Sequence, residues 1–305
     1  MSPDPLLSVV VTIVDGGLVL RECLAALVEQ QNAPRLEIIV PFDASVAAEV
    51  ERMQPEFPGV TFLSIGPLTP GRPIETAAGQ HELYDRRRSA GLRAATGDLI
   101  AILEDRGVPT PGWAAAVVRL HAQPYGVIGG AIEGARRGLL NWAFYVCDFG
   151  RYGLPFTSGP AEWVSDVNVS YKRRVVEATR ELWNERFREP VVHWALLERG
   201  EILYLSSEIV VEHRRPEAPL SVLIPERFHW GRLFGHIRAV HVGVGRRLAY
   251  AALWPVLPAM LFVRHGRTQL RKGNFGRFVK AAPAVAVLLV AWTAGEVWGY
   301  LTNRS

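Results

Sequence analysis

Short apolar runs alternate with amphipathic stretches over the first hundred residues. Each run is rich in β-branched residues and ends at a polar or glycine-containing turn, which is the pattern of a buried strand. The runs cover residues 7–14, 36–40, 60–65 and 99–103. The stretches at residues 18–30 and 81–96 have apolar positions at helical spacing. Because strand and helix alternate, the pattern predicts an α/β fold with a largely parallel sheet and right-handed crossovers.

The pattern is less regular from residue 127 to residue 213. It predicts four further strands, at residues 127–133, 162–171, 202–205 and 209–213. Helices are expected at residues 173–178 and 191–199. The regular alternation of strand and helix ends here, so the α/β sheet is expected to be mixed in this half.

Two long apolar stretches lie near the C-terminus. Residues 281–301 contain Glu296 as their only charge and are long enough to span a bilayer, whereas residues 248–263 are interrupted by Pro255 and Pro258. Six Lys or Arg residues separate the two stretches. Two full spans would place this basic loop across the membrane from the preceding domain, against the positive-inside tendency. A re-entrant hairpin is therefore favoured over two spans, and a buried helical hairpin in a soluble protein is the third alternative.

A basic and apolar stretch, R-F-H-W-G-R-L-F-G-H-I-R, lies just before the apolar segments, at residues 227–238. Its helical spacing predicts an interfacial helix with snorkelling Arg side chains, and the alternative is a helix that caps a domain. The chain is thus expected to divide into an α/β domain over residues 1–215, an amphipathic interfacial segment over 216–247 and a membrane-associated helical hairpin over 248–305.

Composition supports a membrane-associated protein with a cytoplasmic folded part. Of the 305 residues 49% are hydrophobic, and the net charge is only +4 although the C-terminal part is rich in Arg. Basic groups beside apolar segments suggest anionic lipid head groups rather than nucleic acid. The two cysteines, Cys23 and Cys147, lack the spacing of a disulfide framework or a zinc site, and the first residues lack the basic region and cleavage signature that are typical of a signal peptide. The expected location is the inner membrane of the cell, with the α/β domain in the cytoplasm.

Acidic side chains follow three of the predicted parallel strands. They are Asp15, Asp43 and the adjacent pair Glu104-Asp105, and Arg106 comes directly after the pair. The carboxyl ends of parallel strands meet at one edge of a sheet, where open α/β sheets bind ligands. Hard carboxylate oxygens suit Mg²⁺ or Mn²⁺ and could share the ion with a diphosphate. This convergence predicts the binding site.

The order of these motifs resembles that of family 2 glycosyltransferases, whose catalytic domain has the GT-A fold. The resemblance covers roughly residues 7–215. S-V-V-V-T-I-V-D resembles the first strand of that family, and E-I-I-V-P-F-D-A-S resembles E-I-I-V-V-D-D-G-S. R-R-S-A-G-L-R-A-A-T-G-D-L-I-A-I-L-E-D resembles A-R-N-x-G-x-x-x-A-x-G-E-x-I-x-F-L-D-x-D, and V-P-T-P-G-W follows it. The specific feature is the order and spacing of these pieces.

The resemblance implies roles for the strand-end residues. Those expected to bind the nucleotide-sugar donor are Thr12, Asp15, Asp43, Arg88, Glu104 and Arg106. Mg²⁺ or Mn²⁺ is expected on Asp105, with Glu104 and the strand-end His213 as further ligands. The first and third positions of the family's D-x-D are Glu104 and Arg106 here. Either Asp105 supplies the metal ligand, or Arg106 takes over part of the charge neutralisation by a bidentate phosphate contact.

The resemblance also implies a catalytic base in F-R-E-P-V-V-H-W-A-L-L-E-R-G. Glu189 remains from the family's acidic E-D pair, whereas Pro190 replaces the Asp. Asp166, in W-V-S-D-V-N-V-S-Y-K-R, is the second candidate for catalysis, and His193 is a weaker rival that a packing role explains more simply. Asn168 falls where the family has G-x-N, so it is expected to contact the acceptor.

The expected activity is therefore inverting transfer of a sugar from a nucleoside-diphosphate donor to a membrane-held acceptor, plausibly a polyprenyl-linked one. The expected partners are the nucleotide sugar, the acceptor and the membrane. The substitutions at Phe42, Arg106 and Pro190 motivate a second hypothesis, a family member that binds a nucleotide sugar or scaffolds glycan assembly without catalysis. A soluble nucleotidyltransferase is a third hypothesis, which the apolar C-terminal stretches disfavour.

Overall fold

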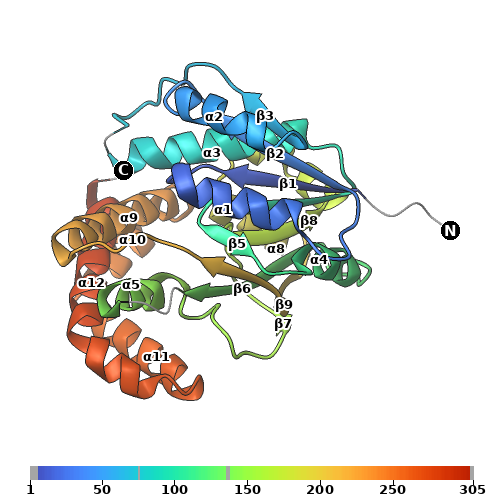
Figure 1. Ribbon diagram of the computed structural model, residues 1–305. Helices are drawn as coiled ribbons and strands as arrows, with labels where there is room; N and C mark the ends of the chain where they lie inside the picture. The colour runs from blue at the N-terminus through green and yellow to red at the C-terminus, as the bar shows by residue number, and fades with distance from the viewer. Residues whose placement is uncertain (1–5, 75, 135–137, 303–305) are drawn as a thin grey trace. The chain divides into compact units, whose positions relative to one another are not determined.

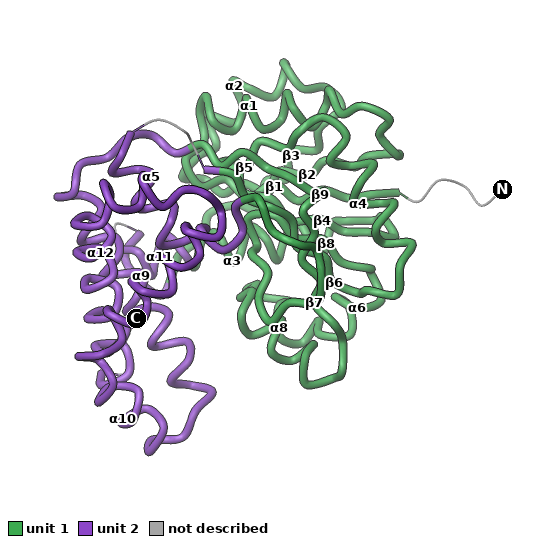
Figure 2. The backbone as a smooth tube through the Cα atoms, turned by 90° about the horizontal axis from the view of Figure 1, so that it is seen from below, with its two compact units in different colours: residues 1–70, 82–133, 154–214 green, residues 71–81, 134–153, 215–305 purple. Residues whose placement is uncertain are grey.

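The computed structural model describes residues 6–74, 76–134 and 138–302. Contacts divide the chain into two compact units (Figure 2). Unit 1 comprises residues 1–70, 82–133 and 154–214, and unit 2 comprises residues 71–81, 134–153 and 215–305. The three-part division at residues 215 and 247 that the sequence suggests stays a prediction.

A mixed sheet forms the centre of unit 1 (Figure 1). Its parallel half has the order β3 (Val60–Ser64), β2 (Leu36–Phe42), β1 (Leu7–Thr12) and β4 (Leu99–Glu104). β1 and the first five residues of β4 are buried, as expected of strands covered on both faces. The parallel strands confirm the α/β fold, and they place the carboxyl ends of β1, β2 and β4 at one edge of the sheet.

Antiparallel strands extend the sheet beyond β4. β8 (Asn168–Lys172) pairs antiparallel with β4, and the order continues through β6 (Val127–Gly134), β9 (Leu203–His213) and β5 (Gly107–Pro109). β7 (Gly159–Pro160) pairs with β9. Because β8 starts opposite the end of β4, with Asn168 beside Leu103, the loop before β8 reaches the same edge as the parallel strand ends.

Eight helical segments contribute to the described part of unit 1. They are α1 (Gly17–Val28), α2 (Ala47–Met53), η1 (Gln54–Glu56), most of α3 (Ala77–Ala94), α4 (Trp113–His121), α6 (Arg173–Glu177), α7 (Arg180–Trp183) and α8 (Glu189–Glu198). α3 packs closely on β1, because a Cβ at Gly91 would collide with the Val10 side chain. This contact explains the glycine in the R-S-A-G motif.

Two strand predictions were wrong in detail. Residues 162–167 do not continue β8, because Ser165 forms a turn: its carbonyl accepts from the Asn168 N–H and its hydroxyl from the Val167 N–H. Residues 202–205 and 209–213 are not separate strands either, since β9 continues through Ser206 and Ser207. The Ser158 hydroxyl accepts from the Ser207 N–H and so holds the polar middle of this strand.

Unit 2 contains α5 (Leu139–Phe149) and the C-terminal helices α9 (Leu220–His241), α10 (Val244–Ala252), α11 (Leu257–Arg271) and α12 (Phe275–Thr302). α9 and α12 pack backbone against backbone, since glycines on each helix face main-chain atoms of the other. Arg227, in the stretch predicted to lie at a lipid interface, is only 2% exposed. It pairs with Asp148, and its guanidinium lies 4.3 Å from the centroid of the Trp292 ring.

One helix among the described residues, α12, is long and apolar enough to cross a membrane. Of an apolar 18-residue segment of this helix, 39% is buried inside the protein. α10 and α11 are long and apolar enough only if they are taken together as one segment. They are bent by 72° at the break between them, which contains Pro255. The expected interruption of the first apolar stretch is thus present.

His121 predicts an acid-sensitive step in stability. The imidazole is 5% exposed at the end of α4, its Nε2 lies 2.9 Å from the Ser170 hydroxyl, and burial lowers its pKa to about 4. Between pH 6.5 and 4 the unfolded chain binds a proton that the folded chain does not, so stability falls with falling pH. This effect lowers the free energy of unfolding by up to about 3 kcal/mol between pH 7 and pH 4. We expect His121→Gln to remove it, and urea unfolding at the two pH values measures the difference. The same change at the exposed His229 should leave it unaltered.

Candidate functional site

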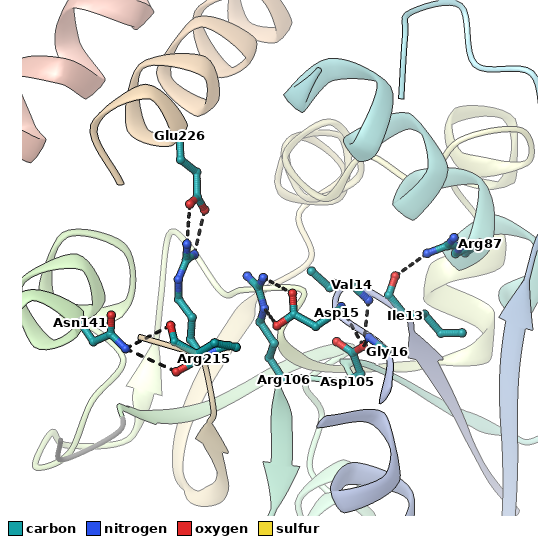
Figure 3. Close-up of polar contacts among 11 residues, drawn as sticks. Ile13, Val14, Asp15, Gly16, Arg87, Asp105, Arg106, Asn141, Arg215 and Glu226 are labelled. Atoms are coloured by element: carbon teal, nitrogen blue, oxygen red, sulfur yellow. Dashed lines mark hydrogen bonds and ion pairs between the residues drawn. The ribbon is translucent and has the colours of Figure 1, made fainter. Parts of the chain in front are cut away.

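The turn after β1 is organised around the Asp105 carboxylate. Oδ2 of Asp105 accepts from three successive backbone N–H groups, those of Val14, Asp15 and Gly16, at 3.0, 3.0 and 2.7 Å (Figure 3). Gly16 has a φ of 72°, which lets the turn curl around the oxygen. Asp105 is fully buried, and its Oδ1 has no hydrogen-bond partner. Burial raises the pKa of Asp105 to about 6, although the N–H donors of Gly16 and Val14 oppose the shift.

Arg106 forms a bidentate ion pair with Asp15. Nε and Nη2 of Arg106 lie 2.7 and 2.5 Å from the two carboxylate oxygens of Asp15 (Figure 3). Burial opposes the charge of Arg106, but the hydrogen bonds that Arg106 donates to Asp15 raise its pKa above the ordinary value. The pair is partly open to solvent, with 18% of the Arg106 side chain exposed, and Nη1 has no hydrogen bond or ion pair with the described residues. A permanent positive charge therefore stands where the family motif has its second acid.

Glu104 belongs to an acidic cluster around Arg88. Nη2 of Arg88 lies 2.7 Å from Glu104 and 2.9 Å from Asp166, and Nη1 lies 3.6 Å from Asp85. Arg88 is 2% exposed and is thus a buried charge shared by three carboxylates. Burial raises the pKa of Glu104 to about 7, against the effect of Arg88 and with a contribution from Asp166. The excess of negative charge makes this end of β4 a favourable place for a cation.

Asp43 pairs with Arg87, a residue outside the set predicted from the sequence. Nε of Arg87 donates to Asp43 at 2.8 Å. Nη1 of Arg87 donates to the Ile13 carbonyl at 2.6 Å (Figure 3). Burial opposes ionisation of Asp43, but Ser45 and Arg87 lower its pKa. Successive helix residues point about 100° apart, so Arg87 and Arg88 reach different strand ends. The position of Arg87 next to Arg88 on a predicted helix is the feature of the sequence from which a second strand-end contact could be predicted.

Glu189 starts α8 and lies near a buried histidine. Oε1 of Glu189 is 3.1 Å from Nδ1 of His193, and Nε2 of His193 is 2.7 Å from the Tyr171 hydroxyl. Burial raises the pKa of Glu189, and His193 opposes the shift. Pro190 stands in the first turn of α8, where its missing N–H costs no hydrogen bond. Replacement of the family's Asp by Pro190 therefore leaves the helix start intact.

The remaining predicted residues are buried. Thr12 lies opposite Glu104 in the β1–β4 register, and its hydroxyl has no hydrogen-bond partner. Asn168 accepts from the Trp113 indole at 3.0 Å and donates to the carbonyls of Ala131 and Ile209 at 2.9 and 3.1 Å. His213 lies on β9 opposite Gly107 and is 6% exposed. The roles of Thr12 in donor binding, Asn168 in acceptor binding and His213 in metal binding stay predictions.

The sequence from residue 8 to residue 154 matches the family described as "Glycosyl transferase family 2". This segment contains β1, the Arg87-Arg88 motif and Glu104-Asp105-Arg106. This segment is a family 2 glycosyltransferase domain. No curated protein sequence matches it significantly. A solved structure similar to this glycosyltransferase is the mannosyltransferase PcManGT from Pyrobaculum calidifontis, in complex with GDP-Man and Mn²⁺. The TM-score is 0.55 and the identity 16%, over 99% of this chain and 88% of that one, which supports the GT-A fold.

The glycosyltransferase offers few protein ligands to a divalent metal ion. Among the described residues, no three or more His, Cys, Asp or Glu side chains are arranged to hold an ion. Asp105 nevertheless keeps one buried carboxylate oxygen without a partner, next to the acid-rich end of β4. This donor set fits an ion that takes one or two protein oxygens and completes its shell with phosphate oxygens and water, as Mg²⁺ commonly does.

Proposed function

We propose that this enzyme is an inverting glycosyltransferase that moves a sugar from a nucleoside-diphosphate donor onto a membrane-held, polyprenyl-linked acceptor. The observation that carries the proposal is the arrangement at the carboxyl ends of β1, β2 and β4. There, Asp15 with Arg106, Asp43 with Arg87 and Glu104 with Arg88 form three ion pairs around the partly unpartnered Asp105. Open α/β sheets bind nucleotides at this edge.

On the donor side, Asp43 and Thr12 line the nucleoside position, and Arg106 faces the diphosphate. Asp15 holds the Arg106 guanidinium in one orientation, so little side-chain freedom is lost when a phosphate binds. Arg106 then neutralises part of the charge on the leaving nucleoside diphosphate. GDP-mannose is the first donor to test, because PcManGT was solved with it.

On the acceptor side, Glu189 removes the proton from the attacking hydroxyl. Direct attack at the anomeric carbon breaks the bond to the diphosphate and inverts the configuration, so one base suffices. Glu189 suits this role better than Asp166, because Asp166 is held by Arg88 at 2.9 Å. The Glu189 side chain is 17% exposed and therefore reachable.

Asp105, with Glu104 and His213 as further candidate ligands, would hold a divalent ion, Mg²⁺ or Mn²⁺. The ion would supply Lewis-acid stabilisation of the leaving diphosphate. Because the protein offers few free oxygens, we expect Mn²⁺ alone to bind at least about tenfold more weakly than Mn²⁺ with a nucleoside diphosphate. Isothermal titration with Mn²⁺, before and after addition of GDP, measures the difference. Equal Mn²⁺ affinity with and without GDP would contradict the shared-ligand site, and Asp105→Asn should abolish the GDP-dependent gain.

Unit 2 attaches the enzyme to the inner membrane, with unit 1 in the cytoplasm. Most large exposed apolar side chains among the described residues belong to α9–α12, and those of α12 include Val287, Val290, Trp298 and Leu301. They recur at helical spacing, so α12 presents an apolar stripe to its surroundings. A lipid bilayer is the environment that such a stripe suits.

The decisive experiment is a transfer assay with the detergent-solubilised full chain. Radiolabelled donor sugars, with GDP-mannose first, are incubated with a lipid extract and Mn²⁺ or Mg²⁺, and label is counted in the organic phase. The proposal expects label in that phase and inverted configuration in the product. Label that enters only water-soluble products would overturn the acceptor assignment, and full activity in EDTA would overturn the metal assignment.

A further inference from the structure

Three side chains form a continuous polar chain inside unit 1. Glu189 and His193 lie one turn apart on α8, and Tyr171 comes from the neighbouring β8. The distances are 3.1 Å from Glu189 Oε1 to His193 Nδ1 and 2.7 Å from His193 Nε2 to the Tyr171 hydroxyl. His193 and Tyr171 are 1% and 0% exposed, whereas Glu189 reaches the surface. The chain therefore runs from a buried phenol to the carboxylate assigned as base.

The proton positions in this chain follow from its chemistry. An ionised carboxylate only accepts hydrogen bonds, so a contact with Glu189 requires a proton on Nδ1 of His193. In a neutral imidazole Nε2 is then an acceptor, and the Tyr171 hydroxyl must donate to it. Burial, with Glu189 and Asp166, raises the pKa of Tyr171 well above its ordinary value, so the phenol keeps the proton that it donates. Tyr171 thus selects the tautomer of His193 that faces Glu189.

We propose that His193 is a positioning residue for Glu189 and that Tyr171 holds His193 in the Nδ1–H tautomer. The proposal rests on the assignment of Glu189 as the base. Nδ1 of His193 makes no hydrogen bond in this structure, although the Glu189 oxygen lies 3.1 Å away, so the oxygen lies off the line of the Nδ1–H bond. A small rotation of either side chain would align the two groups. Neither the D-x-D-like segment nor the metal takes part.

The arrangement has a consequence for the pH dependence of catalysis. The charged groups that face Glu189 are His193 on its own helix, Asp166 from the loop before β8 and Arg88 from α3. Asp166 favours the protonated form of Glu189, and His193 and Arg88 favour the carboxylate. Loss of the Nδ1 donor should therefore raise the pH at which the base loses its proton. The acidic limb of the plot of kcat/KM against pH then moves to higher pH.

Two isosteric variants separate positioning from packing. An Asn side chain places its amide near the Nδ1 position and can still donate to Glu189, whereas a Gln side chain places its amide near Nε2 and can still bond Tyr171. We expect His193→Gln to lower kcat about 10- to 100-fold and to shift the acidic limb upward, with donor KM within threefold of wild type. His193→Asn should keep kcat within about fivefold and leave the limb in place. Transfer rates from pH 5 to 9 and thermal unfolding of each variant provide the readouts.

The outcomes distinguish this inference from the function on which it rests. Identical pH profiles of wild type and His193→Gln, or equal losses in the Gln and Asn variants, would overturn the positioning role. A merely structural His193 would lower the thermal midpoint in both variants without moving the limb. If Glu189→Gln keeps wild-type turnover, the base assignment itself fails. If Glu189→Gln is inactive while His193→Gln has an unshifted limb, only the positioning role fails.

Discussion

Replacement of Glu189 by glutamine is expected to lower turnover by about 10²- to 10⁴-fold, the usual contribution of a general base. Glutamine keeps the size of the side chain but cannot accept the proton of the attacking hydroxyl. Because Glu189 stands at the start of α8 and does not contact the strand-end ion pairs directly, donor KM should change less than fivefold. Initial rates over a range of donor and acceptor concentrations measure both parameters.

Glu198 provides the matched control, since it is an exposed glutamate at the other end of the same helix. Glu198→Gln should leave turnover within twofold of wild type. Asp166→Asn tests the rival base. If Asp166→Asn loses far more activity than Glu189→Gln, with both proteins folded, then the base is Asp166 and the assignment made here is wrong.

Replacement of Arg88 by methionine is expected to destabilise unit 1 by about 3–5 kcal/mol, because removing one partner of a buried ion pair leaves the other charges uncompensated. Methionine fills a similar volume but leaves Asp85, Glu104 and Asp166 without their shared guanidinium. Urea unfolding followed by far-UV circular dichroism measures the loss.

Arg119 is the control for this second prediction. It pairs with Glu208 at 2.5 Å, but the two side chains are 60% and 52% exposed. Arg119→Met should therefore cost no more than about 1 kcal/mol. An Arg88→Met protein that unfolds at the wild-type urea concentration would show that the cluster carries no net stabilisation, which would contradict this prediction.

The place of Glu104-Asp105-Arg106 in the fold is predictable from the sequence, whereas the partners of the three side chains are not. Its position after a buried strand correctly predicts the edge of the sheet, because a short apolar run ending in acids has few other interpretations in an α/β fold. The three residues then have separate partners: Arg88 for Glu104, the β1 turn for Asp105 and Asp15 for Arg106. Adjacent residues at a strand end point in different directions, and no local pattern specifies what they meet.

Local pattern also explains where element predictions succeeded and failed. The four parallel strands are predictable because each is a short, mainly apolar run of the length of one strand. The break before β8 and the continuity of β9 depend on serine hydroxyls that bond to the main chain, at Ser165 and Ser158. A serine is the same polar residue in the sequence whether it forms a turn or lies within a strand. The pattern of apolar and polar residues therefore predicts neither case.

The sequence by itself determined the α/β class, the edge of the sheet at which the candidate residues lie and the family of the enzyme, because apolar periodicity and motif order are local properties of the chain. Only the tertiary structure decided which charges neutralise one another. Arg106 and Asp15 are 91 positions apart and meet because β1 and β4 are neighbours in the sheet. His193 gains a role in the same way, since β8 brings Tyr171 to the helix that carries Glu189. Ion pairs and hydrogen bonds act over a few ångströms, and the topology of the sheet sets which residues come that close.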